Sequence, residues 1–215
     1  PPTAVLPVEG MDILSKSAVA PLDAWRNRRI TGQFPGPRDH HDRYERRLGQ
    51  EDPGPPGPQF RRVANSILEY RVFPTTLIQA VKAPGPLVAG DIVGVRFVAL
   101  PLVDLFFACR VLRGVAEMEE GRWCEGFVYQ TLEGHPERGE ERFAVEKELE
   151  TGVLWGRLSS WSGPGLWLTR LGEPAVRRLQ RYANSRALLN LQQIAEGRPE
   201  NPAAAESKGV PPGGL

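Results

Sequence analysis

The middle of the chain contains six consecutive segments typical of β-strands, joined by short connections, and this run limits the possible folds most strongly. The segments are rich in β-branched and aromatic residues and end at turn residues. They cover residues 75–82, 91–99, 105–115, 122–132, 140–149 and 153–160. Antiparallel strands can be joined by a tight turn, whereas parallel neighbours need a long crossover. The run therefore predicts one antiparallel sheet.

Apolar residues at helical spacing lie on both sides of this run. Before it, the spacing predicts a helix over 59–71 that ends ahead of Pro74, and a weaker helical pattern covers 20–30. After it, Pro174 fits the first turn of a long helix and Gly197 fits its end. The apolar face of that helix consists of Val176, Leu179, Ala183, Ala187, Leu191 and Ile194. The predicted fold class is α+β, with an antiparallel sheet wrapped around a long C-terminal helix.

The length of 215 residues suits one main domain with extensions. We assign residues 43–196 to a single α+β domain that opens with a short strand over 43–48, and residues 1–42 to an N-terminal extension. Within the domain, 49–58 is a loop, because its four prolines and interleaved glycines cannot support a helix or a central strand. The segment 197–215 is rich in Pro, Gly and Ala, which predicts a disordered tail.

Composition argues against several classes of partner. Charged residues make up 25% of the chain but the formal net charge is only +1, so no overall field favours nucleic acid or an anionic membrane. No apolar run approaches the roughly 18–20 residues needed to span a bilayer, and the N-terminus lacks a signal-peptide pattern. Cys109 and Cys124 are too few for a disulfide framework, which favours buried thiols in a reducing compartment. We expect a soluble, cytoplasmic protein.

Several separated motifs give the chain a resemblance to a known family. They are Arg46-Arg47-Leu48-Gly49, the helix from Phe60, Gly90-Asp91, Thr131-Leu132-Glu133-Gly134-His135, Gly139-Glu140-Glu141-Arg142-Phe143, the Ser160 to Pro164 segment and the Leu171 to Arg181 segment. On these residues the chain resembles the family catalogued as domain of unknown function nineteen-ninety, from about Tyr44 to Leu191. Upstream, Gln33-Phe34-Pro35-Gly36 replaces the Thr-Tyr-Pro-Glu segment expected of relatives. The resemblance implies no activity.

The order of predicted elements is similar to the helix-grip architecture of START and Bet v 1-like proteins, which is an analogy of topology only. Such an architecture implies a cavity between the curved sheet and the long helix, suited to an apolar ligand. We therefore expect the protein to bind a small hydrophobic or amphipathic molecule. The candidate ligand-binding residues are Phe127, Tyr129, Thr131, Arg142, Trp155, Trp161 and Tyr182. The alternative is that the aromatic residues form ordinary core and that the hydroxyl groups bond to backbone or solvent.

A second hypothesis is an acid/base enzyme that uses His135 with Glu140 or Glu141. His135 is the core-region residue whose ordinary pKa lies near neutrality, and a neighbouring carboxylate could orient its ring. The simpler alternative is a turn histidine hydrogen-bonded to a neighbour. If 140–143 is a strand, Glu141 shares a face with Phe143, and a buried Glu141 needs an arginine, a backbone donor or a ligand as partner. No metal site is predicted, because one histidine among glutamates has no recognisable ligand spacing.

A third hypothesis is a protein-interaction module that uses Arg177 and Arg181 of the C-terminal helix with the N-terminal extension. The sequence lacks a Gly-rich phosphate loop, a nucleophile elbow and a groove-reading motif. It names no cofactor and no oligomeric state.

Overall fold

The computed structural model describes residues 6–8, 11–33, 40–164 and 173–198, and within these ranges nine strands form one antiparallel sheet. The strands are β1 Leu6–Val8, β2 Met11–Ser15, β3 His40–Gln50, β4 Ile78–Val81, β5 Ile92–Phe97, β6 Val103–Glu119, β7 Arg122–Thr131, β8 Glu137–Glu148 and β9 Val153–Pro164. Their order is β1-β2-β6-β7-β8-β9-β3, and β5 pairs with both β6 and β4. The helices are η1 Leu22–Trp25, α1 Pro58–Leu68 and α3 Glu173–Ala195.

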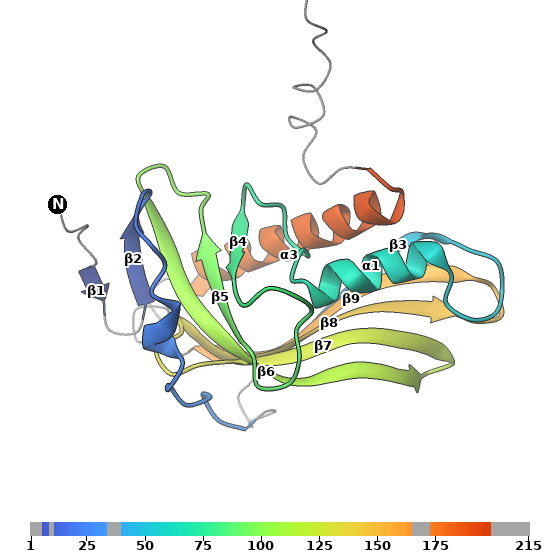
Figure 1. Ribbon diagram of the computed structural model, residues 1–215, viewed down its shortest axis with the longest axis horizontal. Helices are drawn as coiled ribbons and strands as arrows, with labels where there is room; N and C mark the ends of the chain where they lie inside the picture. The colour runs from blue at the N-terminus through green and yellow to red at the C-terminus, as the bar shows by residue number, and fades with distance from the viewer. Residues whose placement is uncertain (1–5, 9–10, 34–39, 165–172, 199–215) are drawn as a thin grey trace, which may run out of the picture.

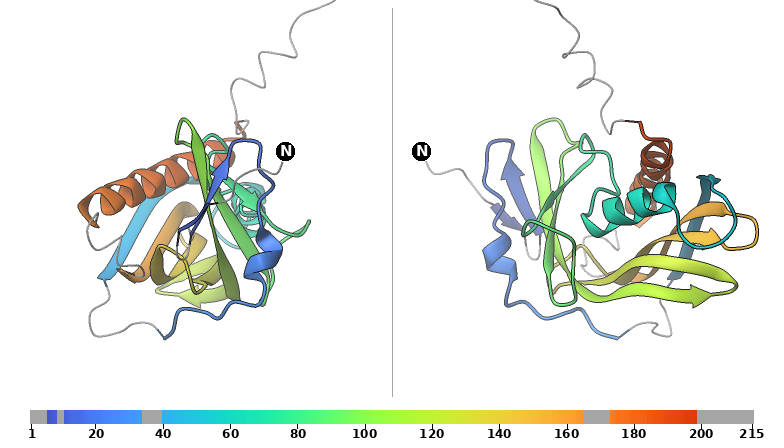
Figure 2. Two further views of the ribbon diagram at one scale, coloured as in Figure 1. Left: turned by 90° about the vertical axis from the view of Figure 1, so that its left-hand side faces the viewer. Right: turned by 45° about the vertical axis from the view of Figure 1, so that its right-hand side comes forward.

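Both α-helices lie on the same face of the sheet, where α1 covers the middle of β7 to β9 and α3 crosses near β3 (Figures 1 and 2). The core lies in this inner layer. Phe60 and Ile67 of α1, Phe143 of β8, Leu158 of β9 and Leu191 of α3 are all without exposed surface. The α+β fold predicted from the sequence, an antiparallel sheet against a long C-terminal helix, is confirmed.

Each of the six predicted strands is present, as β4 to β9. The predicted strand over 105–115 is only part of the 17-residue β6, which continues past a bulge between Val111 and Arg113. The connection between the predicted strands over 122–132 and 140–149 is shorter than their bounds imply, because β8 already begins at Glu137. The predicted short strand over 43–48 extends to His40 and Gln50 as β3.

The N-terminal segment joins the same sheet, since β2 pairs with β6. Trp25 is fully buried against Phe106, and its indole N–H donates to Asp12 at 2.8 Å. The helical pattern over 20–30 yields only the short 3-10 helix η1. The residues before Met11 and between Gln33 and His40 lie largely outside the described ranges, as does the predicted tail beyond Arg198.

The Pro-rich loop over 49–58 is held in place by a buried ion pair between Glu51 and Lys147. The Glu51 carboxylate accepts hydrogen bonds from the backbone N–H groups of Gly57, Gln59 and Phe60 at the start of α1. Lys147 of β8, with 1% of its side chain exposed, donates to Glu51 at 3.1 Å and to the Pro55 carbonyl at 2.9 Å. The loop therefore links α1 to the inner face of the sheet.

The last strand of the order, β3, has a bulge between Arg47 and Gly49 and exposes Arg43 and Arg47. In the described part of the chain, no helix is long and apolar enough to cross a membrane. Cys109 and Cys124 are both buried free thiols, as expected.

Candidate functional site

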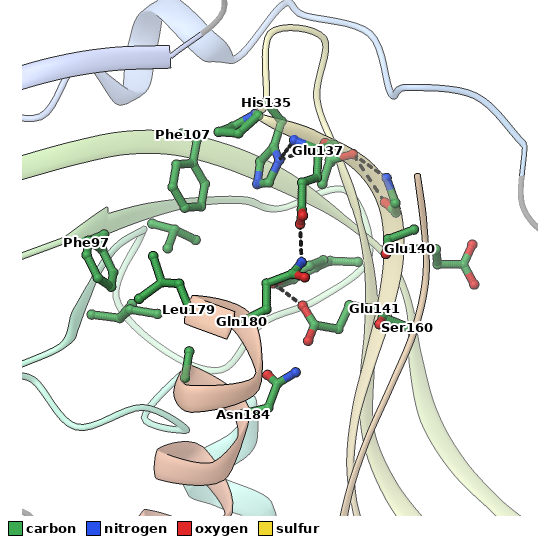
Figure 3. Close-up of a pocket in the computed structure, with 18 of the residues that line it drawn as sticks. Phe97, Phe107, His135, Glu137, Glu140, Glu141, Ser160, Leu179, Gln180 and Asn184 are labelled. Atoms are coloured by element: carbon green, nitrogen blue, oxygen red, sulfur yellow. Dashed lines mark hydrogen bonds between the residues drawn. The ribbon is translucent and has the colours of Figure 1, made fainter. Parts of the chain in front are cut away.

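A cavity of about 330 Å³ lies between the sheet and the N-terminal half of α3 (Figure 3). Its apolar wall comes from the segment after α1, from β4 and β5, and from β6. This wall consists of Phe73, Ile78, Val95, Phe97, Leu105 and Phe107. Leu179 and Ala183 border the cavity from α3. Its volume falls within the range of about 300–1,000 Å³ that is typical of small-molecule sites.

A row of polar side chains crosses the floor of the cavity. Tyr129 of β7 pairs with Glu141 of β8, Glu141 pairs with Ser160 of β9, and Ser160 pairs with Asp42 of β3. Residues directly opposite one another in an antiparallel sheet share a face. All four residues line the cavity, so the row places two carboxyl groups and two hydroxyl groups beneath the ligand space.

Glu141 is the most perturbed acid of this row. Burial raises the pKa of its carboxyl to about 7, and the nearby charge of Glu137 acts in the same direction. The Tyr129 hydroxyl donates to Glu141 Oε2 at 2.8 Å, which lowers the pKa and so opposes these effects. Glu141 is half-buried and lines the cavity. At neutral pH, Glu141 can therefore either hold or release a proton.

Tyr70, which also lines the cavity, extends the network beyond Tyr129. The hydroxyl of Tyr70 lies 3.4 Å from that of Tyr129, and burial raises the pKa of both phenols well above the ordinary value. Tyr70 has a φ of 59° at the end of α1, a left-handed conformation that is uncommon for a residue other than glycine. Its N–H donates to the Ile67 carbonyl at 2.8 Å, which closes the helix. The strained position directs the Tyr70 ring towards Tyr129, at 6.1 Å between centroids.

His135 lines the cavity at its β7–β8 turn. Its ring packs edge-on against Phe107 with centroids 4.5 Å apart. The N–H of Glu137 donates to Nδ1 at 3.0 Å, and the Glu137 carbonyl oxygen lies 2.8 Å from the same atom. Burial lowers the pKa of the imidazole to about 4, so the ring is neutral at physiological pH. The ring is oriented by backbone groups of Glu137, not by the carboxylate that the enzyme hypothesis expected.

The helix α3 contributes amide side chains to the cavity. Gln180 points towards β8 and its Nε2 donates to Glu137 Oε2 (Figure 3). Asn184, one turn further along α3, also lines the cavity. These amides add polar groups to the helix side of the cavity, beside the apolar Leu179 and Ala183.

The structure brings together His135, Glu141, Tyr129 and Thr131, four of the residues that the sequence singled out. Thr131 is committed to the backbone, since its hydroxyl accepts from the Gly139 N–H at 2.9 Å and donates to the Gly139 carbonyl at 3.2 Å. This is the alternative that the sequence left open for the hydroxyl groups.

Other predicted residues lie away from the ligand space. Glu140 and Trp161 border the cavity, but their register places their side chains on the opposite face of the sheet from Glu141, and Figure 3 shows Glu140 pointing outwards. The Trp161 ring stacks on His41 at 4.2 Å. Arg142 and Trp155 belong to that outer face, where Arg142 pairs with Glu119 and the Trp155 indole donates to Glu148.

The last two predicted residues lie on the helix side of the sheet without lining the cavity. Phe127 is fully buried in the core and stacks on Phe143 at 5.2 Å. Tyr182 is 54% exposed on the solvent side of α3. Phe127 therefore serves as core, which is the alternative considered for the aromatic residues.

The sequence did not single out several lining residues, namely Asp42, Phe97, Phe107, Glu137, Ser160, Gln180 and Asn184. A signal existed for some of them. Gln180 and Asn184 are amides four residues apart beside the predicted apolar stripe, which places them on one side of the helix. Ser160 lies two residues after the inward-facing Leu158 on β9, so the two side chains point to the same face of the sheet. Asp42 carried no such signal, because its strand was predicted to begin one residue later.

Three side chains that could together bind a metal ion lie on the outer face of the sheet. Glu119, Cys124 and Glu146 bring their side-chain ligand atoms within 4.8 Å of one another. Arg142 lies 2.5 Å from Glu119 and Arg157 lies 2.8 Å from Glu146, so both carboxylates are already paired. Burial raises the pKa of the Cys124 thiol to about 11, so the thiol stays protonated at neutral pH. These charges disfavour a cation, and the group fastens neighbouring strands.

The sequence of this chain matches the profile of the family described as "Domain of unknown function (DUF1990)" over residues 25–189. A UPF0548 protein of Dictyostelium discoideum is 27% identical over 127 residues, which are 56% of this chain and 59% of that protein. A UPF0548 protein of Deinococcus radiodurans is 43% identical over 56 residues, which are 26% of this chain and 28% of that protein. The chain therefore covers less than two thirds of either relative.

Two solved structures are distantly similar to the chain. The crystal structure of Ara h 8.0201 has a TM-score of 0.43 and 11% identity, and the match covers 74% of this chain and 99% of that one. A point mutant of norcoclaurine synthase from Thalictrum, in complex with a transition-state analogue, has a TM-score of 0.42 and 12% identity. That match covers 74% of this chain and 94% of the synthase. The fold assignment here rests on the chain's own strand order and pairing.

Proposed function

The chain belongs to the DUF1990 family, and we propose that it binds a small amphipathic molecule in the cavity between the sheet and α3. The observation that carries the proposal is the two-sided lining of this cavity. An aromatic and aliphatic wall faces a small number of converging polar groups, centred on Glu141 and Tyr129. Such a combination is typical of sites that hold the apolar body of a ligand and orient its polar end.

Blocking the cavity tests the proposal. Ala183 lines the cavity from α3, whereas Ser185 is exposed on the same helix and does not line it. Ala183→Phe adds bulk to the ligand space, and Ser185→Phe adds the same bulk on the solvent side. The neutral fluorescent dye prodan serves as the probe.

We expect the wild type and Ser185→Phe to bind prodan with similar affinity, and Ala183→Phe to bind it at least tenfold more weakly. Equal binding by all three proteins would show that the dye does not use this cavity. No binding to the wild type would count against the proposal as well. Native mass spectrometry of the purified wild type would then identify a retained molecule by its mass.

A second candidate function is acid/base catalysis in the same cavity, favoured by one observation. The pKa of Glu141, raised to about 7 by burial, suits a group that takes up and gives back a proton at neutral pH. In this proposal Glu141 acts from the cavity floor, and the neutral His135 at the cavity edge can accept or donate a hydrogen bond. Glu140 takes no part, because its side chain points away.

The two functions differ in what the protein retains. We compare the molecules that co-purify with the wild type and with Glu141→Gln by native mass spectrometry. A catalyst should release product from the wild type, and the variant should accumulate a substrate of different mass. The same molecule at the same occupancy in both proteins would argue for binding without catalysis.

A further inference from the structure

Among the described residues that line the cavity, the charged side chains are all acidic. Carboxyl groups are contributed by Asp42 of β3 and by Glu137 and Glu141 of β8. Among the described residues that line the cavity, there is no lysine or arginine. A cleft lined by one sign of charge with apolar walls concentrates its field and favours ligands of the opposite sign. A fatty acid or another anion would face the carboxyl groups of Asp42 and Glu141 at the sheet side of the cavity.

The acceptors are also placed for a group with several N–H donors. Glu141, Ser160 and Asp42 are successive partners across β8, β9 and β3 on the inner face of the sheet. Neighbouring strands lie about 4.8 Å apart, so the backbone positions of Glu141 and Asp42 are roughly 10 Å apart, with Ser160 on the strand between them. A protonated amine has three donors and no acceptor, and it can bond to a carboxylate and a hydroxyl at the same time.

The opposite wall defines the rest of the molecule. Phe97 and Phe107 face the cavity from β5 and β6 (Figure 3), together with Ile78 and Val95. This wall offers apolar and aromatic contact but few polar partners. The ligand that matches both sides has an apolar or aromatic body and one cationic end.

Resting on the proposed binding function, we propose that the natural ligand is a small hydrophobic amine whose ammonium group binds at Glu141 and Ser160, with its apolar body against Phe97 and Phe107. Glu141 is the main recognition residue. Because Tyr129 already donates to Glu141 Oε2, the orientation of the carboxylate is fixed before the ligand arrives. Preorganisation of this kind lowers the cost of binding.

The proposal has a pH signature that a purely apolar site would lack. The pKa of Glu141 is about 7 in the free protein, because burial raises it, and an ammonium group beside it would lower that pKa. Below pH 7 the amine must therefore displace a proton from Glu141. Its affinity should rise with pH, by up to about tenfold per pH unit below 7, and should level off above that value.

Three probes with one skeleton test the inference by displacement of prodan: 4-phenylbutylamine, 4-phenylbutan-1-ol and 4-phenylbutyrate. At pH 8 we expect the amine to bind at least tenfold more tightly than the alcohol, and the acid most weakly. Glu141→Gln should abolish most of the preference for the amine and leave the affinity for the alcohol within about twofold. Glu133→Gln is the matched control, because it removes an exposed carboxylate near the same turn.

The outcomes separate the two proposals. If the alcohol or the acid bound as tightly as the amine or more tightly, the proposal of an amine ligand would be wrong, but the cavity would remain a binding site. A preference for the amine that survives in Glu141→Gln would also overturn the assigned contact. Failure of all three probes in a protein that binds prodan would again reject the amine, whereas failure of prodan as well would reject the binding function.

Discussion

The hydrogen bond from Tyr129 to Glu141 makes a quantitative prediction about the cavity acid. Tyr129→Phe removes the 2.8 Å donor to Glu141 Oε2 and leaves the ring in place. The bond favours the ionised carboxylate, so its loss must raise the pKa of Glu141 above the value of about 7 that burial produces. A hydrogen bond to a charged group is worth about 1.5–3 kcal/mol, and 1.36 kcal/mol corresponds to one pKa unit. The pKa of Glu141 should therefore rise by about 1 to 2.

Carbon-13 NMR of glutamate carboxyl groups measures this change directly, with Glu141→Gln identifying the resonance. Tyr70→Phe is the control, because Tyr70 contacts Tyr129 at 3.4 Å but its hydroxyl is one residue further from Glu141 in the network. We expect a much smaller change in that variant. If the pKa of Glu141 stayed the same or fell in Tyr129→Phe, the reasoning about the origin of its value would be refuted.

Three further predictions concern stability. Because the folded-state pKa of Glu141 is raised from 4.5 to about 7, the free energy of unfolding of the wild type should fall by about 3 kcal/mol relative to that of Glu141→Gln between pH 4 and pH 8. The comparison cancels groups common to both proteins, such as His135 with its lowered pKa, and urea denaturation of both proteins at both pH values measures it. Glu51→Ala should lower the free energy of unfolding by about 3–5 kcal/mol, because it leaves the buried Lys147 without its carboxylate partner. A decrease of less than about 1 kcal/mol would contradict the assigned ion pair. Gly126→Ala should lower the free energy of unfolding by at least about 2 kcal/mol, because the added Cβ would lie 1.9 Å from a backbone oxygen of β8. Gly114→Ala is the control, because the nearest atom to its added Cβ is 4.0 Å away. Similar melting temperatures for the two alanine variants would refute the packing argument.

The strands and the long helix could be predicted because their side chains alternate or recur with a clear period. Leu154 and Leu158 face the core along β9, and the same alternation places Trp155 on the outer face. The sequence therefore contained the evidence against Trp155 as a cavity residue. The N-terminal β2 could not be predicted in this way, because its place beside β6 depends on tertiary pairing and not on a local pattern.

The candidate site was predictable only in part. Glu141 lies two residues before Phe143 on the predicted strand, which indicated that both side chains point inwards, and they do. Its partner Tyr129 depends on the register of the β7–β8 hairpin, and a shift of one residue would move every side chain to the other face. Since β8 begins at Glu137, three residues before the predicted strand over 140–149, the sequence could not fix that register. The contribution of Gln180 depends on how α3 is docked, which no local pattern reports.

On the side away from β9, β3 pairs with no other strand among the described residues, and this has a consequence for how copies of this protein can meet. An unpaired strand edge offers backbone donors and acceptors to any passing chain, and natural sheets protect such edges with bulges and charged side chains. This edge has both, in the irregularity between Arg47 and Gly49 and in the exposed Arg43 and Arg47. Growth of the sheet from one molecule into the next is thereby discouraged, and self-association through this strand should be resisted even at high concentration.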